Sequence, residues 1–181
     1  HVAERLGVTV RAVDSGQWAV DRDMDSFLTL MNETATRDHF VQHPLTYLGA
    51  TAQFFSARGM ATLRVAERGG KMLAANLEIV FGDTVTYLYG ASSSVERNAN
   101  APTLLQWSAI RDASARGFSL YDLWGANPEW RGMFYYKPSW DGITRWKRGF
   151  GGRLVQLVGT WDLPFHGSIY NLLHLDQFSR G

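Results

Sequence analysis

One stretch, residues 84–125, constrains the fold more than any other part of the chain. It begins with β-branched and aromatic residues over 84–89, which predict a strand that ends at Gly90. Pro102 then stands where a helix tolerates proline best, in its first turn, and apolar residues follow at helical spacing. The largely apolar run 118–123 predicts a second strand, buried at a central position of a sheet. Strand, helix and strand in this order predict a βαβ unit, which binds ligands at the carboxyl ends of its strands.

The segments before this unit predict two helices and an antiparallel meander. Apolar stripes predict helices over 21–36 and from Pro44 to about residue 57. Residues 8–12 alternate, and predict either an edge strand or the tail of a preceding element. Glycine-containing turns join three strand-like segments, which are Ala61–Glu67, Lys71–Phe81 and Thr84–Tyr89. The order of these elements predicts an α/β fold, a mixed sheet flanked by helices.

The last part of the chain is aromatic and rich in turns. Residues 127–141 interleave Trp, Phe and Tyr with basic residues. Residues 153–162 alternate as a strand does, and 168–178 have the pattern of an amphipathic helix.

Composition excludes several classes of function. The chain has no cysteine, which rules out a disulfide framework, a thiol nucleophile and thiolate metal sites. Its 181 residues suit one domain and carry a formal net charge of +1, so contact with RNA would need a local basic patch. His39 and His43 have no third ligand nearby, so no zinc site is predicted. No run of 18 apolar residues is present, so no membrane-spanning helix is predicted.

Four sequence signatures, in order and spacing, resemble those of one known family. They are Glu33–Arg37 with Phe40, Tyr89–Ser92, Leu104–Trp107 with Tyr121, Asp122 and Gly125, and Trp146–Gly152. This set resembles the second domain of the Fem family, the aminoacyl-tRNA-dependent transferases that build peptidoglycan interpeptide bridges. The resemblance implies a GNAT-like (acyl-CoA N-acyltransferase-like) fold, of which family members carry two copies in tandem. Because the chain resembles the second domain and has room for only one, we expect residues 1–181 to be a single GNAT-like domain, the C-terminal half of a two-domain enzyme.

The resemblance also implies a reaction, partners and a location. The reaction is transfer of an amino acid from aminoacyl-tRNA to the stem-peptide amine of a peptidoglycan precursor. The ester donor is already activated, so the protein needs only to align the amine, remove a proton and stabilise the oxyanion, and no cofactor is implied. The implied partners are aminoacyl-tRNA, a UDP-linked or lipid-linked muropeptide precursor and a missing N-terminal domain. The implied location is the cytoplasm, with peripheral contact at the inner face of the plasma membrane if the acceptor is lipid-linked.

A GNAT-like fold leaves an acyl-coenzyme A donor as an alternative. The pyrophosphate loop of GNAT acetyltransferases has an Arg or Gln, then a Gly, then a Gly or Ala, so that backbone amides reach the phosphates. Here residues 97–102 have Asn100 in place of the Gly, and Pro102 removes one amide. This departure argues against an ordinary coenzyme A site. A catalytically silent domain that binds the precursor or RNA is a third possibility.

The resemblance assigns roles to Lys147 and Arg37, each with an alternative. Lys147 stands where family members place a lysine near the reaction centre, and would stabilise the oxyanion or bind the 3′ end of the RNA. The alternative is a solvated lysine at a strand end. Arg37 would bind a precursor phosphate, or it would instead pair with Asp38 or Glu33.

Four further residues carry two interpretations each. Trp146 would stack on a base or pack in a core. Arg148 would join Lys147 in a phosphate patch or solvate the surface. Tyr89 would face the cleft, as the resemblance favours, or pack in the core. Asp122, a carboxylate in an apolar strand, would orient a catalytic group or support a backbone turn.

Overall fold

The computed structural model describes residues 2–13, 22–130, 136–158, 163–168 and 170. The chain divides into two compact units, His1–Gly125 and Ala126–Gly181. The helices of the first unit are α1 (Val2–Arg5), α2 (Arg22–Asp38), α3 (Leu45–Ser56), the 3-10 turn η2 (Arg97–Ala99) and α4 (Ala101–Ala115). Its strands are β1 (Thr9–Val13), β2 (Ala61–Arg68), β3 (Lys71–Phe81), β4 (Thr84–Ser92) and β5 (Leu120–Asp122).

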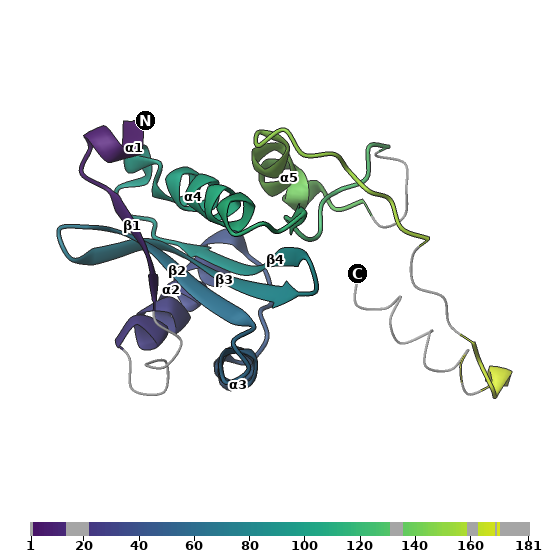
Figure 1. Cartoon of the computed structure of the whole chain (residues 1–181). Helices are drawn as coiled ribbons and strands as arrows, with labels where there is room; N and C mark the ends of the chain where they lie inside the picture. The colour runs from purple at the N-terminus through teal and green to yellow at the C-terminus, as the bar shows by residue number, and fades with distance from the viewer. Residues whose placement is uncertain (1, 14–21, 131–135, 159–162, 169, 171–181) are drawn as a thin grey trace. The chain divides into compact units, whose positions relative to one another are not determined.

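The five strands of the first unit form one mixed sheet in the order β1-β2-β3-β4-β5. The pairs from β1 to β4 are antiparallel, and β5 pairs with β4 in parallel after the α4 crossover. Figure 1 shows α4 above the sheet and α2 and α3 below it, so helices cover both faces. The predicted mixed sheet flanked by helices, its meander and its βαβ unit are confirmed.

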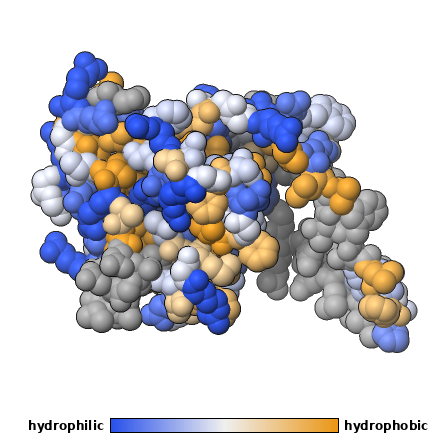
Figure 2. Space-filling model, in the orientation of Figure 1, coloured by the Kyte–Doolittle hydropathy of each residue, from blue (hydrophilic) through white to orange (hydrophobic). Residues whose placement is uncertain are grey.

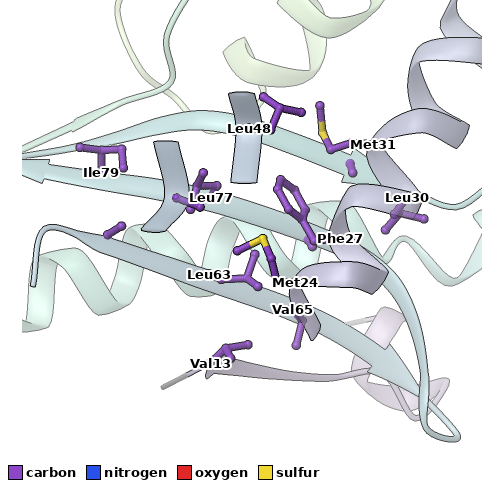
Figure 3. Packing of buried hydrophobic residues seen from close by; sticks show 14 residues of the cluster. Val13, Met24, Phe27, Leu30, Met31, Leu48, Leu63, Val65, Leu77 and Ile79 are labelled. Atoms are coloured by element: carbon purple, nitrogen blue, oxygen red, sulfur yellow. The ribbon is translucent and has the colours of Figure 1, made fainter. Parts of the chain in front are cut away.

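The hydrophobic core of this unit lies between the sheet and helices α2 and α3. Apolar residues recur on α2 at helical spacing, and Phe27 is fully buried among them. It packs with Leu63 and Val65 of β2 and Leu77 of β3, as Figure 3 shows. A second buried cluster, which includes Leu104 and Leu105 of α4, occupies the other side of the sheet. The two clusters lie on opposite faces of β2 and β3, and the face toward α4 also carries polar side chains, among them Arg64 and Asn76.

The βαβ unit differs from the prediction at both of its strands. β4 continues beyond Gly90 as far as Ser92. β5 has only three residues, lies at the edge of the sheet, and leaves the Leu120 side chain 54% exposed. The prediction of a buried central strand is therefore wrong. An apolar run does not by itself distinguish a central strand from an edge strand, because burial depends on which neighbours the strand acquires.

The described part of the second unit contains η3 (Pro138–Trp140) and α5 (Asp141–Arg148). The predicted strand over 153–162 is wrong for residues 153–158, which form no strand, and residues 159–162 lie outside the described residues. Most of the predicted helix over 168–178 also lies outside them. Among the residues that the structure describes, no helix is both long enough and apolar enough to cross a membrane.

The core predicts that the same truncation at two phenylalanines changes the free energy of unfolding by very different amounts. Phe27→Ala should lower the free energy of unfolding by about 3–5 kcal/mol, because the truncation leaves a cavity. Phe81→Ala, at a side chain that is 79% exposed, should change it by less than about 0.5 kcal/mol. Urea denaturation of both variants measures the difference. Equal losses would contradict the placement of Phe27 in the core.

Candidate functional site

The candidate site lies where β4 and β5 diverge. β5 pairs only with residues Thr84–Thr86, at the beginning of β4. β4 then continues along β3, where Ser92 pairs with Ala74. Ligands of α/β folds bind where the carboxyl ends of neighbouring strands separate. The second half of β4 and the loop after it are therefore the parts of the first unit to consider for binding.

A β-bulge in β4 directs two tyrosines to opposite faces of the sheet. Tyr89 pairs with Leu77 and Tyr87 pairs with Glu78, so Leu88 has no partner on β3. Leu77 and Glu78 are consecutive and face opposite sides, and their tyrosine partners do the same. Bulges of this kind frequently lie beside active sites.

Tyr89, a predicted substrate-binding residue, points toward the core that α2 and α3 cover. Its ring is half-buried and packs against that hydrophobic cluster. Burial, with a smaller contribution from Tyr47, raises the pKa of the Tyr89 hydroxyl. These contacts are those of the core-packing alternative, and a cleft-facing role for Tyr89 stays a prediction.

Gly90 makes room for the ring of Tyr87. A Cβ atom at residue 90 would overlap the hydroxyl and Cζ of the Tyr87 side chain. The sequence predicted that Gly90 closes the strand, whereas the structure indicates that glycine is needed here for close approach. Burial, together with the nearby Glu78 carboxylate, raises the pKa of Tyr87.

The end of α2 holds the end of β4 through three residues of the first signature. The Thr34 hydroxyl accepts a hydrogen bond from the Ser92 amide at 3.0 Å. The Glu33 carboxylate accepts one from the Ser94 amide at 2.6 Å. The Arg37 Nη1 donates to the Ser92 carbonyl oxygen at 2.6 Å. The signature therefore has a structural task, which is to fix the backbone where the loop leaves the sheet.

Arg37 also forms a two-point ion pair with Asp38. Its Nε and Nη2 donate to the two Asp38 oxygens at 2.8 and 2.7 Å. The hydrogen bond to Asp38 raises the pKa of Arg37 in spite of partial burial, and the Glu33 carboxylate adds to the effect. The ion pair with Asp38 that was the alternative for Arg37 is thus present, and a phosphate contact stays a prediction.

The loop from Ser93 to Asn100 uses its own carbonyl groups to satisfy amides. The amides of Ala99, Asn100, Thr103 and Leu104 donate to the carbonyl oxygens of Glu96, Arg97 and, twice, Asn100. Pro102 has no amide to offer. Asn100 adopts a φ of 52°, a left-handed conformation that suits glycine and that asparagine also tolerates. Asn100 thus has a backbone conformation that glycine also adopts, while the amides of Ala99 and Asn100 are already bonded and Pro102 has none to offer a diphosphate.

A buried polar network lies between the sheet and α4. The Glu78 carboxylate, on a residue that is 2% exposed, accepts hydrogen bonds from Arg64 Nε at 3.3 Å and from the Tyr121 hydroxyl at 3.3 Å. Gln106, which is fully buried, donates through Nε2 to the Tyr121 oxygen at 2.8 Å and accepts from Asn76 at 3.2 Å. Burial raises the pKa of Glu78, although the Arg64 guanidinium opposes this effect.

The network joins residues that the sequence signatures contained to others that they missed. Gln106 and Tyr121 belong to the third signature, whereas Arg64, Glu78 and Asn76 were not singled out. A signal existed, because charged residues stand inside otherwise apolar strands and a buried charge needs a partner. Asp122 has a different task, since its Oδ1 accepts the Trp124 amide at 2.7 Å in a backbone turn.

In the second unit, Lys147 lies in the last turn of α5 and is 9% exposed. The alternative of a solvated lysine at a strand end is therefore wrong. Trp146 contacts Phe150 edge to face, with 5.1 Å between ring centroids, as in a packed core. Arg148 is exposed and lies 3.5 Å from a Glu129 carboxylate oxygen. The structure groups Lys147, Trp146 and Arg148 in this unit, and Arg37 and Tyr89 in the first.

Asn127 fixes the beginning of α5. Its backbone amide donates to the Thr144 hydroxyl at 3.0 Å, and its Nδ2 donates to the Lys137 carbonyl at 2.7 Å and to Asp141 Oδ1 at 3.0 Å. The Lys137 amide returns a bond to Asn127 Oδ1 at 3.1 Å. Every polar group of this buried side chain is thus used, and the helix that carries Lys147 is held at its first turn.

Comparison with known proteins decides the family. The model of the FemAB family matches residues 60–177. The chain belongs to the FemAB family. The match covers three of the four signatures, namely those in β4, in α4 with β5, and in and after α5.

Named relatives are aminoacyltransferases. The UDP-N-acetylmuramoylpentapeptide-lysine N(6)-alanyltransferase of Weissella viridescens is 31% identical over 65% of this chain and 34% of its own length. The Lipid II:glycine glycyltransferase of Staphylococcus saprophyticus is 28% identical over 63% of this chain and 26% of its own length. The matched segment thus spans about a third or less of these relatives.

Solved structures confirm the GNAT-like fold. FemX superposes with a TM-score of 0.67 at 17% identity, and the match covers 80% of this chain and 51% of FemX. An aminoglycoside acetyltransferase from a soil metagenome superposes with a TM-score of 0.61 at 10% identity, and there the match covers 87% of this chain and 96% of the other.

The Glu33 contacts generate a prediction about pH. Backbone hydrogen bonding by the Ser94 amide lowers the pKa of Glu33, so its stabilising effect is present above the ordinary glutamate pKa and is lost as the pH falls below it. Glu33→Gln should therefore lower the free energy of unfolding by about 1 kcal/mol at pH 7, because solvent weakens the interactions of this partly exposed carboxylate. The difference from the unchanged protein should shrink below about pH 4. Urea titrations at pH 7 and pH 3.5 measure it.

Asn32→Ala is a suitable control, because Asn32 is an exposed neighbour on the same helix whose hydrogen bond with Gln42 involves no titratable group, so its effect should be the same at both pH values. A Glu33→Gln difference that is the same at both pH values would contradict a role for the carboxylate charge.

Proposed function

We propose that this chain is the C-terminal GNAT-like domain of an aminoacyltransferase that moves an amino acid from aminoacyl-tRNA to the stem-peptide amine of a peptidoglycan precursor. The observation that carries the proposal is the FemAB match over residues 60–177, together with relatives that are named as alanyl- and glycyltransferases. The coverage of about half of FemX supports the assignment of this chain to one of two domains.

The reaction requires the protein only to position the two substrates and to stabilise the charge that develops. The precursor amine attacks the ester carbonyl carbon, a C–N bond forms, and the ester C–O bond to the tRNA breaks. The amine loses a proton and the departing ribose oxygen gains one, so the step is balanced without an oxidant or a metal. The protein must hold the amine near the ester and stabilise the oxyanion of the tetrahedral intermediate.

Lys147 is the proposed electrostatic catalyst. An ammonium group on a mostly buried side chain interacts more strongly with a developing oxyanion than an exposed one, because the surrounding dielectric is lower. The Asn127 contacts support this role, since they hold the helix that carries the lysine. Trp146 and Arg148 are proposed to contact the RNA end, through a base and a phosphate respectively.

Arg37 and Tyr89 are proposed to serve the precursor at the end of β4. The Arg37 guanidinium is already anchored to the Ser92 carbonyl and to Asp38, so its orientation is fixed before a ligand arrives. A preorganised guanidinium loses little conformational freedom when it binds a phosphate. The precursor, linked to UDP or to a lipid, supplies such phosphates.

Two substitutions test this assignment in a transfer assay with the full-length protein. Lys147→Ala should lower kcat about 100-fold or more, because a preorganised charge near the oxyanion is lost. Arg37→Ala should mainly raise the KM for the precursor, about tenfold, because it removes a ground-state contact. Rates are measured with aminoacyl-tRNA as donor and with the UDP-linked or the lipid-linked muropeptide as acceptor.

Two exposed arginines on the same helices provide matched controls. Arg145→Ala on α5 and Arg22→Ala on α2 remove a cation without touching the proposed contacts, and should leave both constants within about twofold. Near-normal rates for both Lys147→Ala and Arg37→Ala would remove the site assignment. Precursor binding without turnover in the unchanged protein would point instead to a silent binding domain.

An acyl-coenzyme A donor is the second candidate, favoured by the superposition on acetyltransferases. The internal hydrogen bonds of the loop at 99–104 oppose it. Calorimetric titration of the protein with coenzyme A should therefore show no binding up to about 1 mM, the weak end of ordinary ligand affinities. Micromolar binding, or a diphosphate seated on the amides of residues 98–101 in a crystal, would overturn the RNA-ester proposal.

A further inference from the structure

β4 changes from an inner strand to an edge strand part-way along its length. β5 pairs only with Thr84–Thr86, whereas β3 pairs with β4 as far as Ser92. In the part of the chain that the structure describes, no strand pairs with residues 88–91 on the β5 side. We call residues 88–91 the open edge of β4. A strand edge of this kind presents main-chain donors and acceptors with which another extended segment can pair.

The main-chain groups of Gly90 face the open edge. The amide and the carbonyl of Ser92 bond to side chains of α2, so they are directed away from β3. The Ser93 amide, one residue further on, donates instead to the carbonyl oxygen of Leu73 in β3. Alternate residues of a strand in an antiparallel pair direct their main-chain groups to the same side. Gly90, two residues before Ser92, therefore presents a donor and an acceptor to the open edge.

The open edge has no charged side chain and no proline to protect it. Natural sheets commonly place such residues on their edge strands, which prevents pairing with other chains. β1, an outer strand of this sheet, has Arg11 at its centre, and β5 has Asp122. Residues 88–91 are Leu, Tyr, Gly and Ala. They are half-buried or buried, so a hydrogen bond formed there is partly shielded from water.

We propose that the open edge binds the peptide part of the precursor as an added strand, in which Gly90 exchanges two main-chain hydrogen bonds with one residue of the peptide. This mode of binding rests on the proposed function, in which the acceptor is a stem peptide with successive amides. The proposed donor is a single amino acid esterified to RNA, which has no peptide amide to pair in this way.

The position of Arg37 favours the same ligand. Its Nη1 donates to the Ser92 carbonyl oxygen at 2.6 Å. Because a strand rises about 3.3 Å per residue, Ser92 and Gly90 lie roughly 7 Å apart along β4. A precursor that carries both phosphate and peptide can therefore contact the guanidinium and the open edge together.

The chain itself contains an alternative partner for an unprotected strand edge. Val155, Leu157 and Val158 are exposed, in a segment of the second unit that forms no strand. Figure 2 shows apolar residues along this segment, which is yellow-green in Figure 1. Valine and leucine suit a strand, so the Gly90 amide must be shown to be accessible before the precursor is added.

Hydrogen exchange at the Gly90 amide tests the proposal. The full-length protein, with isotope-labelled glycine, is compared with and without the muramoylpentapeptide precursor that the transfer assay accepts. Saturating precursor should slow exchange of the Gly90 amide about tenfold or more, because a new hydrogen bond protects it. Gly82, in the turn between β3 and β4, is the control glycine and should keep its rate within about twofold.

Ester analogues of the precursor provide a second measurement. Each analogue has one peptide N–H replaced by an oxygen atom, which removes a single donor. In an added strand only alternate residues face the edge. One analogue should therefore lose about five- to tenfold in affinity, and the analogue modified at the next residue less than about twofold.

A Gly90 amide that is already protected in the free protein would overturn the proposal, because another part of the chain would then cover the edge. Transfer at ordinary rates without protection of Gly90, or equal losses in all ester analogues, would remove the added strand and leave the proposed function standing. Protection by coenzyme A and not by the precursor would remove both. Absence of transfer to either precursor would remove the proposed function and the added strand with it.

Discussion

The burial of the Glu78 carboxylate is the constraint on which the arrangement around β4 depends. A carboxylate removed from water is costly unless charged or polar partners surround it, and burial raises the pKa of Glu78 accordingly. Its partners come from β2 through Arg64 and from β5 through Tyr121. These strands must therefore keep their register for the carboxylate to stay satisfied. Loss of one partner would leave a buried charge unpaired, which strongly destabilises a fold.

This constraint acts on the strands that border the candidate site. Gln106 ties α4 to the Tyr121 hydroxyl, so the short strand β5 is held against the first part of β4 and ends there. The other end of β4 is held separately, by Thr34 and Arg37 of α2. One strand thus has two independent anchors, and between them lies the bulge that turns Tyr87 and Tyr89 to opposite faces. Hydrogen bonds and strand pairing thus hold β4 on both sides of the point where β5 ends.

The sequence predicts the helices and strands better than it predicts how they pair and pack. Periodicity predicts α2, α3 and the meander because local spacing determines which faces are apolar. It does not predict the bulge at Leu88, since one extra residue leaves the composition of the run unchanged. The edge position of β5 and the Arg64–Glu78 pair depend on distant partners, which no local window contains. Lys147 was singled out by its motif alone, and its burial in a helix depends on packing within the second unit.

The loop before α4 shows why a residue pattern is a weaker guide to donor choice than the hydrogen bonds that it forms. Asn100 occupies the position of the expected glycine and keeps the same left-handed backbone, so the change of residue does not alter the path of the loop. Within the loop, the amides of Ala99 and Asn100 already donate to the carbonyls of Glu96 and Arg97. A diphosphate at residues 97–102 would meet two amides that are already bonded, those of Ala99 and Asn100, and no donor at Pro102. The hydrogen bonds of the loop therefore bear on a diphosphate donor more directly than the change from glycine to asparagine does.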